Sequence, residues 1–130
     1  MTDMILHDYC LSDGETGETS CQGKFLQLVL ERQDYLVFSP GSLHRYHNQM
    51  LARFLEGKSV AHHWITQERL EYDTSKLEVL GGGRFRADRE ARTLELWDDS
   101  HVYGRFENQG LAESIAHTGH PWSSYRVRIS

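Results

Sequence analysis

Hydrophobic residues alternate with polar ones, or cluster in short runs, along most of this chain, and this pattern is typical of β-strands. The runs at 25–30 and 35–38 are separated by a charged turn, which predicts a hairpin. Weaker or alternating strand patterns recur at 64–65, 76–80, 84–87, 93–97 and 124–129. The order of these segments predicts an antiparallel succession of strands.

Two segments instead carry apolar residues at helical spacing. After the break at 39–42, where Ser42 is a candidate N-cap, apolar positions recur every three or four residues from Leu43 to Leu55, and this helix is expected to end at Gly57. A second, shorter helix is expected over 111–116. Together the patterns predict an α/β protein of the α+β type, with a single mostly antiparallel mixed sheet of about six strands flanked by two helices.

The first 22 residues contain a polar, glycine-spaced stretch from Ser12 to Ser20, which cannot bury a continuous apolar face. We therefore expect a flexible arm over 1–22 and a folded domain over 23–130. Cys10 and Cys21 lie in this arm, and their separation matches no zinc-ligand spacing. Since nothing in the first residues resembles a secretory leader, they are expected to be free thiols in a cytoplasmic protein.

Length and charge limit the classes of function. A chain of 130 residues is long enough to bury a core of its own, so it requires no structural metal or disulfide. The net charge of −5 argues against general affinity for nucleic acid or for an anionic membrane. No apolar run is long enough to span a membrane. A monomer that binds neither nucleic acid nor membrane is expected.

The run from Leu80 to Arg84 contains three consecutive glycines followed by an arginine. Glycine lets another group approach the main chain closely, and the guanidinium is a planar donor suited to carboxylate or phosphate. The same run also fits a bulge, a turn or a close packing point between two strands. The motif alone leaves both interpretations open.

Three further features can carry chemistry. His47 lies between Leu43 and Met50 on the apolar face of the first helix, so it is expected to face the sheet. Lys24 opens the first long strand and either is solvated or points along the sheet toward a shared cleft. The loop from Ser100 to Gly104 precedes the second helix, so its amides can converge on phosphate at a helix N-terminus, with the Ser100 hydroxyl as a further donor; it also fits a plain capped turn.

Other kinds of site are disfavoured by the sequence. His44, His47, His62 and His63 suggest a metal, but no HExxH-like spacing accompanies them. No Gly-x-Ser-x-Gly motif is present, and neither cysteine has a context that would activate it. We expect neither a metal nor another cofactor.

Taken together, four motifs resemble the phosphohistidine phosphatases of the Janus/Ocnus family, in the same order and over about residues 23–129. They are Gly23-Lys24-Phe25, Tyr46-His47, Leu80-Gly81-Gly82-Gly83-Arg84 and Ser100-His101-Val102-Tyr103-Gly104. The resemblance implies a cofactor-independent enzyme in which His47 is the general base and Lys24 binds substrate. It also implies a phosphate-binding loop of Ser100, His101 and Val102, with Arg84 as an added cation.

The chain departs from the family pattern at several positions. Asp98 and Asp99 stand where the family usually has glycine and an aromatic residue, His101 replaces an apolar residue, and the segment 57–76 is longer. The family's arginine ahead of the catalytic histidine has no clear counterpart. The leading hypothesis is a hydrolase that removes phosphate from phosphohistidine, with phospholysine as a further candidate substrate, in proteins or peptides. A non-catalytic phosphate or phosphopeptide-binding module is the alternative, followed by a metal-dependent hydrolase.

Overall fold

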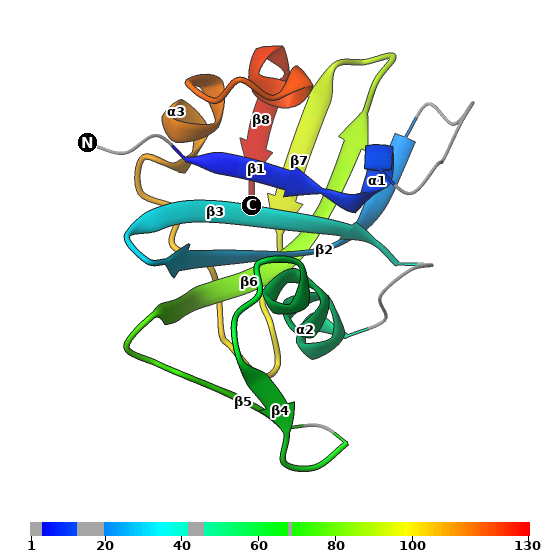
Figure 1. Cartoon of the computed structure of the whole chain (residues 1–130). Coiled ribbons are helices and arrows are strands. Elements are labelled where there is room, and N and C mark those ends of the chain that lie inside the picture. The colour runs from blue at the N-terminus through cyan, green and yellow to red at the C-terminus, as the bar shows by residue number, and fades with distance from the viewer. Residues whose placement is uncertain (1–3, 13–19, 42–45, 68) are drawn as a thin grey trace.

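A computed structural model describes residues 4–12, 20–41, 46–67 and 69–130. Its main element is a six-stranded sheet in the order β1-β3-β2-β6-β7-β8 (Figure 1). The outer pairs β1–β3 and β7–β8 are parallel, and the three inner pairs are antiparallel. The strands of this sheet are β1 (Ile5–Asp8), β2 (Ser20–Leu30), β3 (Gln33–Pro40), β6 (Leu77–Asp88), β7 (Thr93–Trp97) and β8 (Arg126–Ile129).

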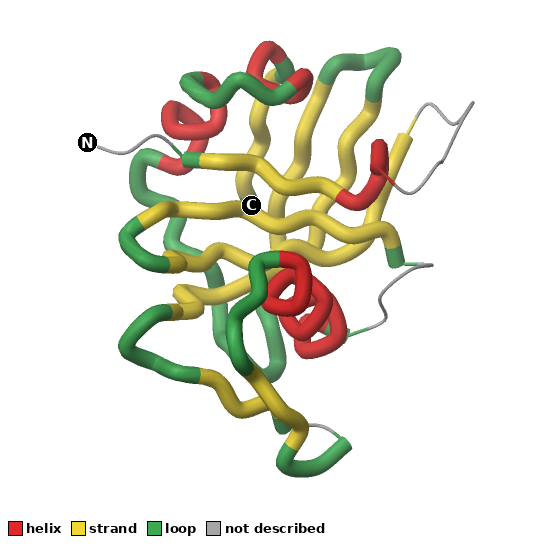
Figure 2. The backbone as a smooth tube through the Cα atoms, viewed as in Figure 1, coloured by secondary structure: helices red, strands yellow, loops and turns green. Residues whose placement is uncertain are grey.

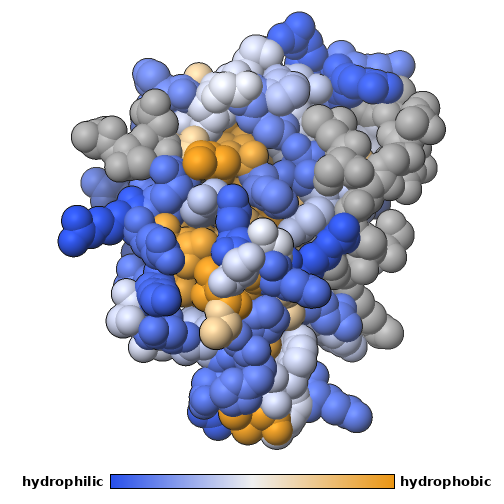
Figure 3. All heavy atoms as spheres, in the orientation of Figure 1, coloured by the Kyte–Doolittle hydropathy of each residue, from blue (hydrophilic) through white to orange (hydrophobic). Residues whose placement is uncertain are grey.

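The remaining elements are short and lie around this sheet. The hairpin of β4 (His62–Trp64) and β5 (Leu70–Tyr72) forms a second, two-stranded sheet. Its tip is an exposed apolar area at the foot of the molecule in Figure 3, where Trp64 and Ile65 are exposed. The helices are α1 (Tyr9–Ser12), α2 (His47–Gly57), α3 (Leu111–Ala116) and a 3-10 helix, η1 (Pro121–Ser124). The predicted fold class is confirmed by this mostly antiparallel sheet with α2 and α3 beside it.

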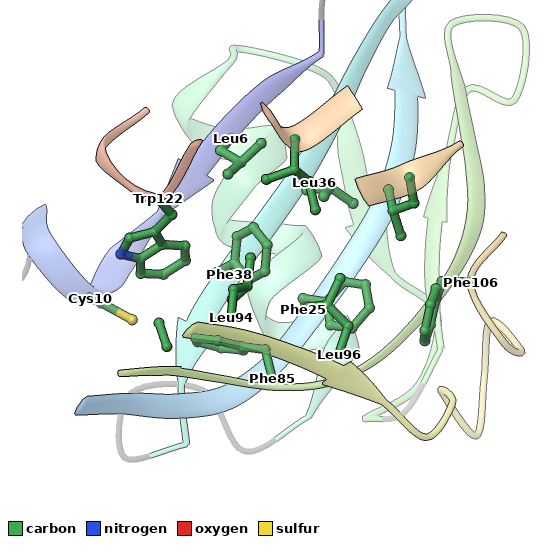
Figure 4. Packing of buried hydrophobic residues seen from close by; sticks show 13 residues of the cluster. Leu6, Cys10, Phe25, Leu36, Phe38, Phe85, Leu94, Leu96, Phe106 and Trp122 are labelled. Carbon is green, nitrogen blue, oxygen red and sulfur yellow. The ribbon is translucent and has the colours of Figure 1, made fainter. Parts of the chain in front are cut away.

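The two faces of the sheet bury different cores, because side chains alternate along each strand. On the first, here called the core face, aromatic residues from the central strands meet α3 and η1 (Figure 4). The rings of Phe38 and Phe85 are 5.0 Å apart, and Trp122 of η1 lies 5.1 Å from Phe38. On the other, the α2 face, α2 packs against apolar residues of β2 and β3, among them Leu26, Leu28 and Val37.

The sheet is strongly twisted, so that β1 and β3 run across the view in Figures 1 and 2 while β7 and β8 run along it. Helix α2 lies over the β2–β3 part of the sheet, well away from β8. On β6 the helix reaches Leu77 and Gly82, so the α2 face of β7, of β8 and of residues 84–88 of β6 is the part that this helix does not cover.

The glycine run does not separate two strands. Segments 76–80 and 84–87 belong to the single strand β6, and the register with β2 shifts between Gln27 and Leu28, opposite the start of the glycines. This irregularity is the bulge that one of the two interpretations of the motif predicted. A Cβ at Gly81 would overlap the backbone of Arg105, so the glycine also permits a close approach of two chain segments.

The N-terminal segment contradicts part of the predicted arm. β1 pairs in parallel with β3, and residues 20–22 pair with β6, so residues 5–8 and 20–22 belong to the sheet, and residues 9–12 between them form α1. Residues 1–3 and 13–19 of the predicted arm lie outside the described residues. Cys10 and Cys21 form a disulfide, which corrects the prediction of two free thiols. The pairing was not visible in the sequence because only the position of β1 beside β3 brings Cys10 to the start of β2.

Within the described residues, the structure contains no helix long and apolar enough to span a membrane.

Candidate functional site

His47 is the first residue of α2 and lies under the helix against the glycine run. Its side chain is buried, with 5% of the residue exposed, and its Nε2 lies 3.1 Å from the carbonyl oxygen of Gly83. A carbonyl only accepts hydrogen bonds, so Nε2 carries the hydrogen, and in the neutral ring Nδ1 holds the lone pair. The structure thus fixes the tautomer that leaves Nδ1 as the basic atom.

Two local features hold His47 in place. At the start of α2 the Tyr46 N–H donates to Oε1 of Gln49 at 3.2 Å, while the Gln49 N–H donates to the Tyr46 carbonyl at 3.1 Å. On the strand below, a Cβ at Gly82 would lie 3.0 Å from Cδ2 and Nε2 of His47. The ring fits because this residue has no side chain, which is why the glycine run and the histidine belong to one site.

The surroundings of His47 favour its neutral form. Burial lowers the pKa of His47 most strongly, and the nearby positive charge of Lys24 lowers it further. The carbonyls of Gly83 and Phe25 and the charge of Asp98 act in the opposite direction but do not compensate. The net pKa lies below the ordinary value of 6.5, so the ring is neutral and able to accept a proton at pH 7.

Lys24 and Arg84 lie directly opposite each other on β2 and β6. Lys24 shares a face with Leu26, which packs under α2, so both cations are on the same side of the sheet as His47. Together with Trp97 they line a hollow of about 550 Å³ at the start of β2. The structure therefore places His47, Lys24 and Arg84 on one face of the sheet.

Asp98 has a partner that the sequence did not predict. Its Oδ2 lies 3.2 Å from Nε of Arg84, and the two side chains are 43% and 57% exposed. An exposed pair of this kind is worth about 1 kcal/mol or less, so an incoming anion can compete for the guanidinium. A carboxylate beside a phosphate would repel it, and here the charge of the Asp98 carboxylate is partly neutralised by the cation next to it.

The loop from Ser100 to Gly104 is a closed turn docked on β6. Ser100 and Gly104 exchange backbone hydrogen bonds of 3.0 and 2.8 Å, and the Gly82 N–H donates to the Gly104 carbonyl at 3.0 Å. Gly82 therefore has His47 over its face and this loop along its edge. Ser100 is buried, and its Oγ accepts from the Tyr103 N–H at 3.2 Å, so the hydroxyl shapes the loop.

The amides of His101 and Val102 are the loop donors that remain. In the described part of the chain no hydrogen bond engages either N–H group, and both residues are exposed, Val102 by 58%. Val102 lines a different hollow from that of Lys24 and Arg84, between the start of α2 and the β4–β5 hairpin. The predicted residues therefore form two groups on either side of His47.

The predicted helix N-terminus behind this loop is wrong. Helix α3 begins at Leu111, with Gly110 as its N-cap, and it packs against the core face through Leu111 and Ile115. Six residues separate it from Gly104, and its partners lie across the sheet from His47. The prediction failed because the apolar spacing of 111–116 identifies the helix but does not specify the conformation of the segment between Gly104 and the helix.

Histidine positions do not assemble a metal centre within the described residues, where no group of three or more potential ligand side chains is found. His62 and His63 lie on β4, with His62 Nδ1 2.8 Å from the Val60 carbonyl and His63 paired with Glu71 at 3.2 Å. His44 lies outside the described residues.

Sequence reasoning missed the backbone and aromatic parts of the site. The Gly83 carbonyl that orients His47 and the Trp97 side chain beside Arg84 were not predicted. Trp97 could have been found from the sequence. It is the last residue of an alternating strand, and the alternation places it on the side of the strand that faces solvent. The carbonyl had none, since a backbone group carries no sequence pattern.

Comparison with known proteins assigns no family. No protein-family model matches the chain, and a search of curated proteins gives no significant match. The function of the site is therefore inferred from its geometry and from the four sequence motifs.

Proposed function

We propose that this chain is a hydrolase that transfers a phosphoryl group to water, with His47 as general base. The observation that carries the proposal is the placement of a neutral histidine, held by a backbone carbonyl, on the same sheet face as two cations from neighbouring strands. A base of lowered pKa accepts the proton of an attacking water, and cations bind the phosphoryl oxygens. This combination suits phosphate-ester or phosphoramidate hydrolysis better than acyl transfer.

Within this class we propose phosphohistidine phosphatase activity on proteins or peptides, which is also the activity implied by the resemblance of the four motifs. Nδ1 of His47 takes a proton from water as the water oxygen forms a bond to phosphorus. The P–N bond breaks, its electron pair stays on the imidazole of the substrate, and that nitrogen takes up a proton from solvent. His47 then releases the proton it accepted to solvent and returns to its neutral form. Lys24, Arg84 and the amides of His101 and Val102 are the donors for the phosphoryl oxygens.

The lability of the P–N bond makes this small site chemically adequate. The leaving imidazole needs only a proton and orientation, so the reaction demands a positioned base and an anion-binding surface. Phospholysine contains the same type of bond and is a further candidate substrate. Neither the chemistry nor the residues named requires a cofactor.

One observation favours the second candidate function, a non-catalytic phosphate-binding module. Asp98 already pairs with Arg84, and a carboxylate at this place opposes the charge that accumulates in phosphoryl transfer. In such a module His47 would only pack on Gly82 and bond to Gly83.

The test is phosphate release from a phosphohistidine peptide in the presence of EDTA, corrected for spontaneous hydrolysis. We compare wild type with His47→Gln, whose amide can still donate to the Gly83 carbonyl, and with His117→Gln, an exposed histidine on the other side of the sheet, as the matched control. We expect His47→Gln to lower kcat at least about 100-fold and the control to have no effect.

Each other outcome selects a different function. If His47→Gln releases phosphate at the wild-type rate, His47 is not the general base. If EDTA abolishes phosphate release by wild type, the reaction depends on a metal. Binding of the peptide without release by wild type identifies the module.

A further inference from the structure

On the α2 face, β7, β8 and residues 84–88 of β6 form a surface that continues from the candidate site and that no helix among the described residues covers. Leu94, Leu96, Val127 and Ile129 face the core, so the residues between them on β7 and β8 point to the opposite side. Helix α2 packs on β2 and β3, and α3 and η1 pack on the core face. None of these elements packs over this surface, which we call the outer face.

The outer face carries a concentration of positive charge. Its cationic residues come from three of the strands β2, β6, β7 and β8, which neighbour one another: Lys24 on β2, Arg84 and Arg86 on β6, and Arg126 and Arg128 on β8. The four arginines are exposed and Lys24 is half-buried. The chain as a whole has a net charge of −5, so this face is opposite in sign to the molecule that bears it.

The strand register arranges these charges as a track. Arg84 lies opposite Trp97, and in the next row Arg86 lies opposite Glu95, which in turn lies opposite Arg128. Hollows are found at both ends of the track. One is lined by Lys24, Arg84 and Trp97, and the other by Thr93, Arg126 and Arg128.

We propose that the outer face docks an extended acidic segment of the substrate protein, adjacent in sequence to the phosphohistidine that enters the site at His47. This inference rests on the proposed function and names a substrate class for it. Lys24 and Arg84 belong both to the site and to the track, so a peptide held at the site by its phosphoryl group continues over Trp97 toward β8.

The interspersed carboxylates favour a peptide over a nucleic acid. Asp88 and Glu95 lie on the same face between the arginines, with Asp88 Oδ2 3.8 Å from Arg86. A polyanion with one charge per nucleotide would meet both carboxylates, whereas a peptide can place its acidic residues only opposite the arginines. The net charge of the chain would also oppose a long polyanion.

The sheet geometry sets the spacing of the acidic residues. Two strand steps of about 4.8 Å separate Arg84 from β8, and residues along a strand rise about 3.3 Å each. Arg128 is therefore about 12 Å and Arg126 about 16 Å from Arg84 by backbone geometry. An extended peptide covers these distances in about four and five residues, so acidic residues three to five positions from the phosphohistidine should be preferred.

The experiment measures binding and turnover of two phosphohistidine peptides. One has glutamates three to five residues from the histidine on either side, and the other has glutamines at those positions; an unphosphorylated copy of the acidic peptide is measured by fluorescence anisotropy. The protein variants are the double substitution Arg126→Gln/Arg128→Gln and the charge-matched control Arg69→Gln/Lys76→Gln, two exposed residues elsewhere on the chain.

We expect wild type to bind the acidic peptides more tightly than the glutamine peptide, and the Arg126/Arg128 variant to lose about three- to tenfold of that affinity, as two exposed charge pairs imply. KM should rise while kcat is retained, and turnover of the glutamine peptide should not change. The loss should disappear at 1 M salt, where exposed charges are screened.

Two outcomes overturn the docking proposal: the same loss in the Arg69/Lys76 control, or no preference for acidic over glutamine peptide in wild type. Tighter binding of single-stranded DNA of equal charge through Arg126 and Arg128 overturns the choice of a peptide. If the acidic preference depends on these arginines but neither phosphopeptide is hydrolysed, the proposed function fails and the docking face stands.

Discussion

A methyl group at Gly82 is the most direct test of how the glycine run holds the candidate base. In Gly82→Ala the added Cβ would lie 2.7 Å from the Phe25 carbonyl oxygen and 3.0 Å from Cδ2 and Nε2 of His47, where ordinary contact begins at 3.4 Å. The ring must therefore retreat by about 0.4 Å or more, which stretches the 3.1 Å bond from Nε2 to the Gly83 carbonyl to the limit of a hydrogen bond.

The free-energy cost follows from two effects. Overpacking costs about 1–3 kcal/mol, and the weakened hydrogen bond about 1 kcal/mol more. For a chain of 130 residues the entropy of unfolding is about 0.27 kcal/mol per degree, so a loss of about 2–4 kcal/mol lowers Tm by about 7–15 °C. We expect this shift in thermal unfolding followed by circular dichroism.

The site should change together with the stability. Nitrogen NMR of the His47 ring should show loss of the single tautomer that bonds to Gly83, because the ring no longer fits its place. Gly119→Ala is the matched control, since a Cβ there meets nothing within 4 Å. A Tm within about 2 °C of wild type, or an unchanged His47 tautomer in Gly82→Ala, would refute the close packing on which the site depends.

Three further predictions concern the disulfide, pH and Asp98. Reducing Cys10–Cys21, which are 11 residues apart, should lower stability by about 3 kcal/mol and Tm by about 10 °C; two reactive thiols before reduction would contradict the pairing. Folding lowers the pKa of His47, so as pH falls the unfolded chain binds a proton at this residue before the folded chain does. The free energy of unfolding should therefore decrease below about pH 6.5, and it should decrease less in His47→Gln. The same pH dependence of urea unfolding in wild type and His47→Gln would contradict this. Asp98→Asn should raise affinity for inorganic phosphate about two- to fivefold in a calorimetric titration, since Arg84 loses its competitor; an unchanged or weaker affinity would show that the pair does not oppose binding.

The long strands and the helix α2 could be predicted because each has a local period. The alternation at 93–97 and the helical spacing before Gly57 depend only on which side chains face apolar surroundings, and β7 and α2 follow them. The parallel edge strand β1 was missed because four residues in a polar context carry almost no periodic signal. Its place beside β3, and with it the disulfide, is a property of the assembled sheet.

The candidate site was predictable residue by residue but not in its arrangement. Lys24, His47 and Arg84 stood out by residue type and context, and their shared face depends on a register that no local pattern specifies. The disulfide also bears on the expected cytoplasmic location, because such bonds persist mainly in oxidising compartments. The disulfide and the expected cytoplasmic location therefore disagree. A count of free thiols in the protein isolated from its source shows whether the bond is formed there.

The path of the chain after Gly104 changes the physical basis of anion binding at this site. A loop at the start of a helix would be close to the positive end of the helix dipole, but six residues separate Gly104 from α3, which packs on the core face. Under the proposed function, anion binding would then come from the two cations on β2 and β6 and from two loop amides, whose contributions are screened differently by salt. If so, phosphate affinity should fall steeply with ionic strength, because exposed cations provide most of it. A site whose affinity depends on exposed cations gains from further positive charge nearby, and the arginines of β8 provide that charge on the same face of the sheet.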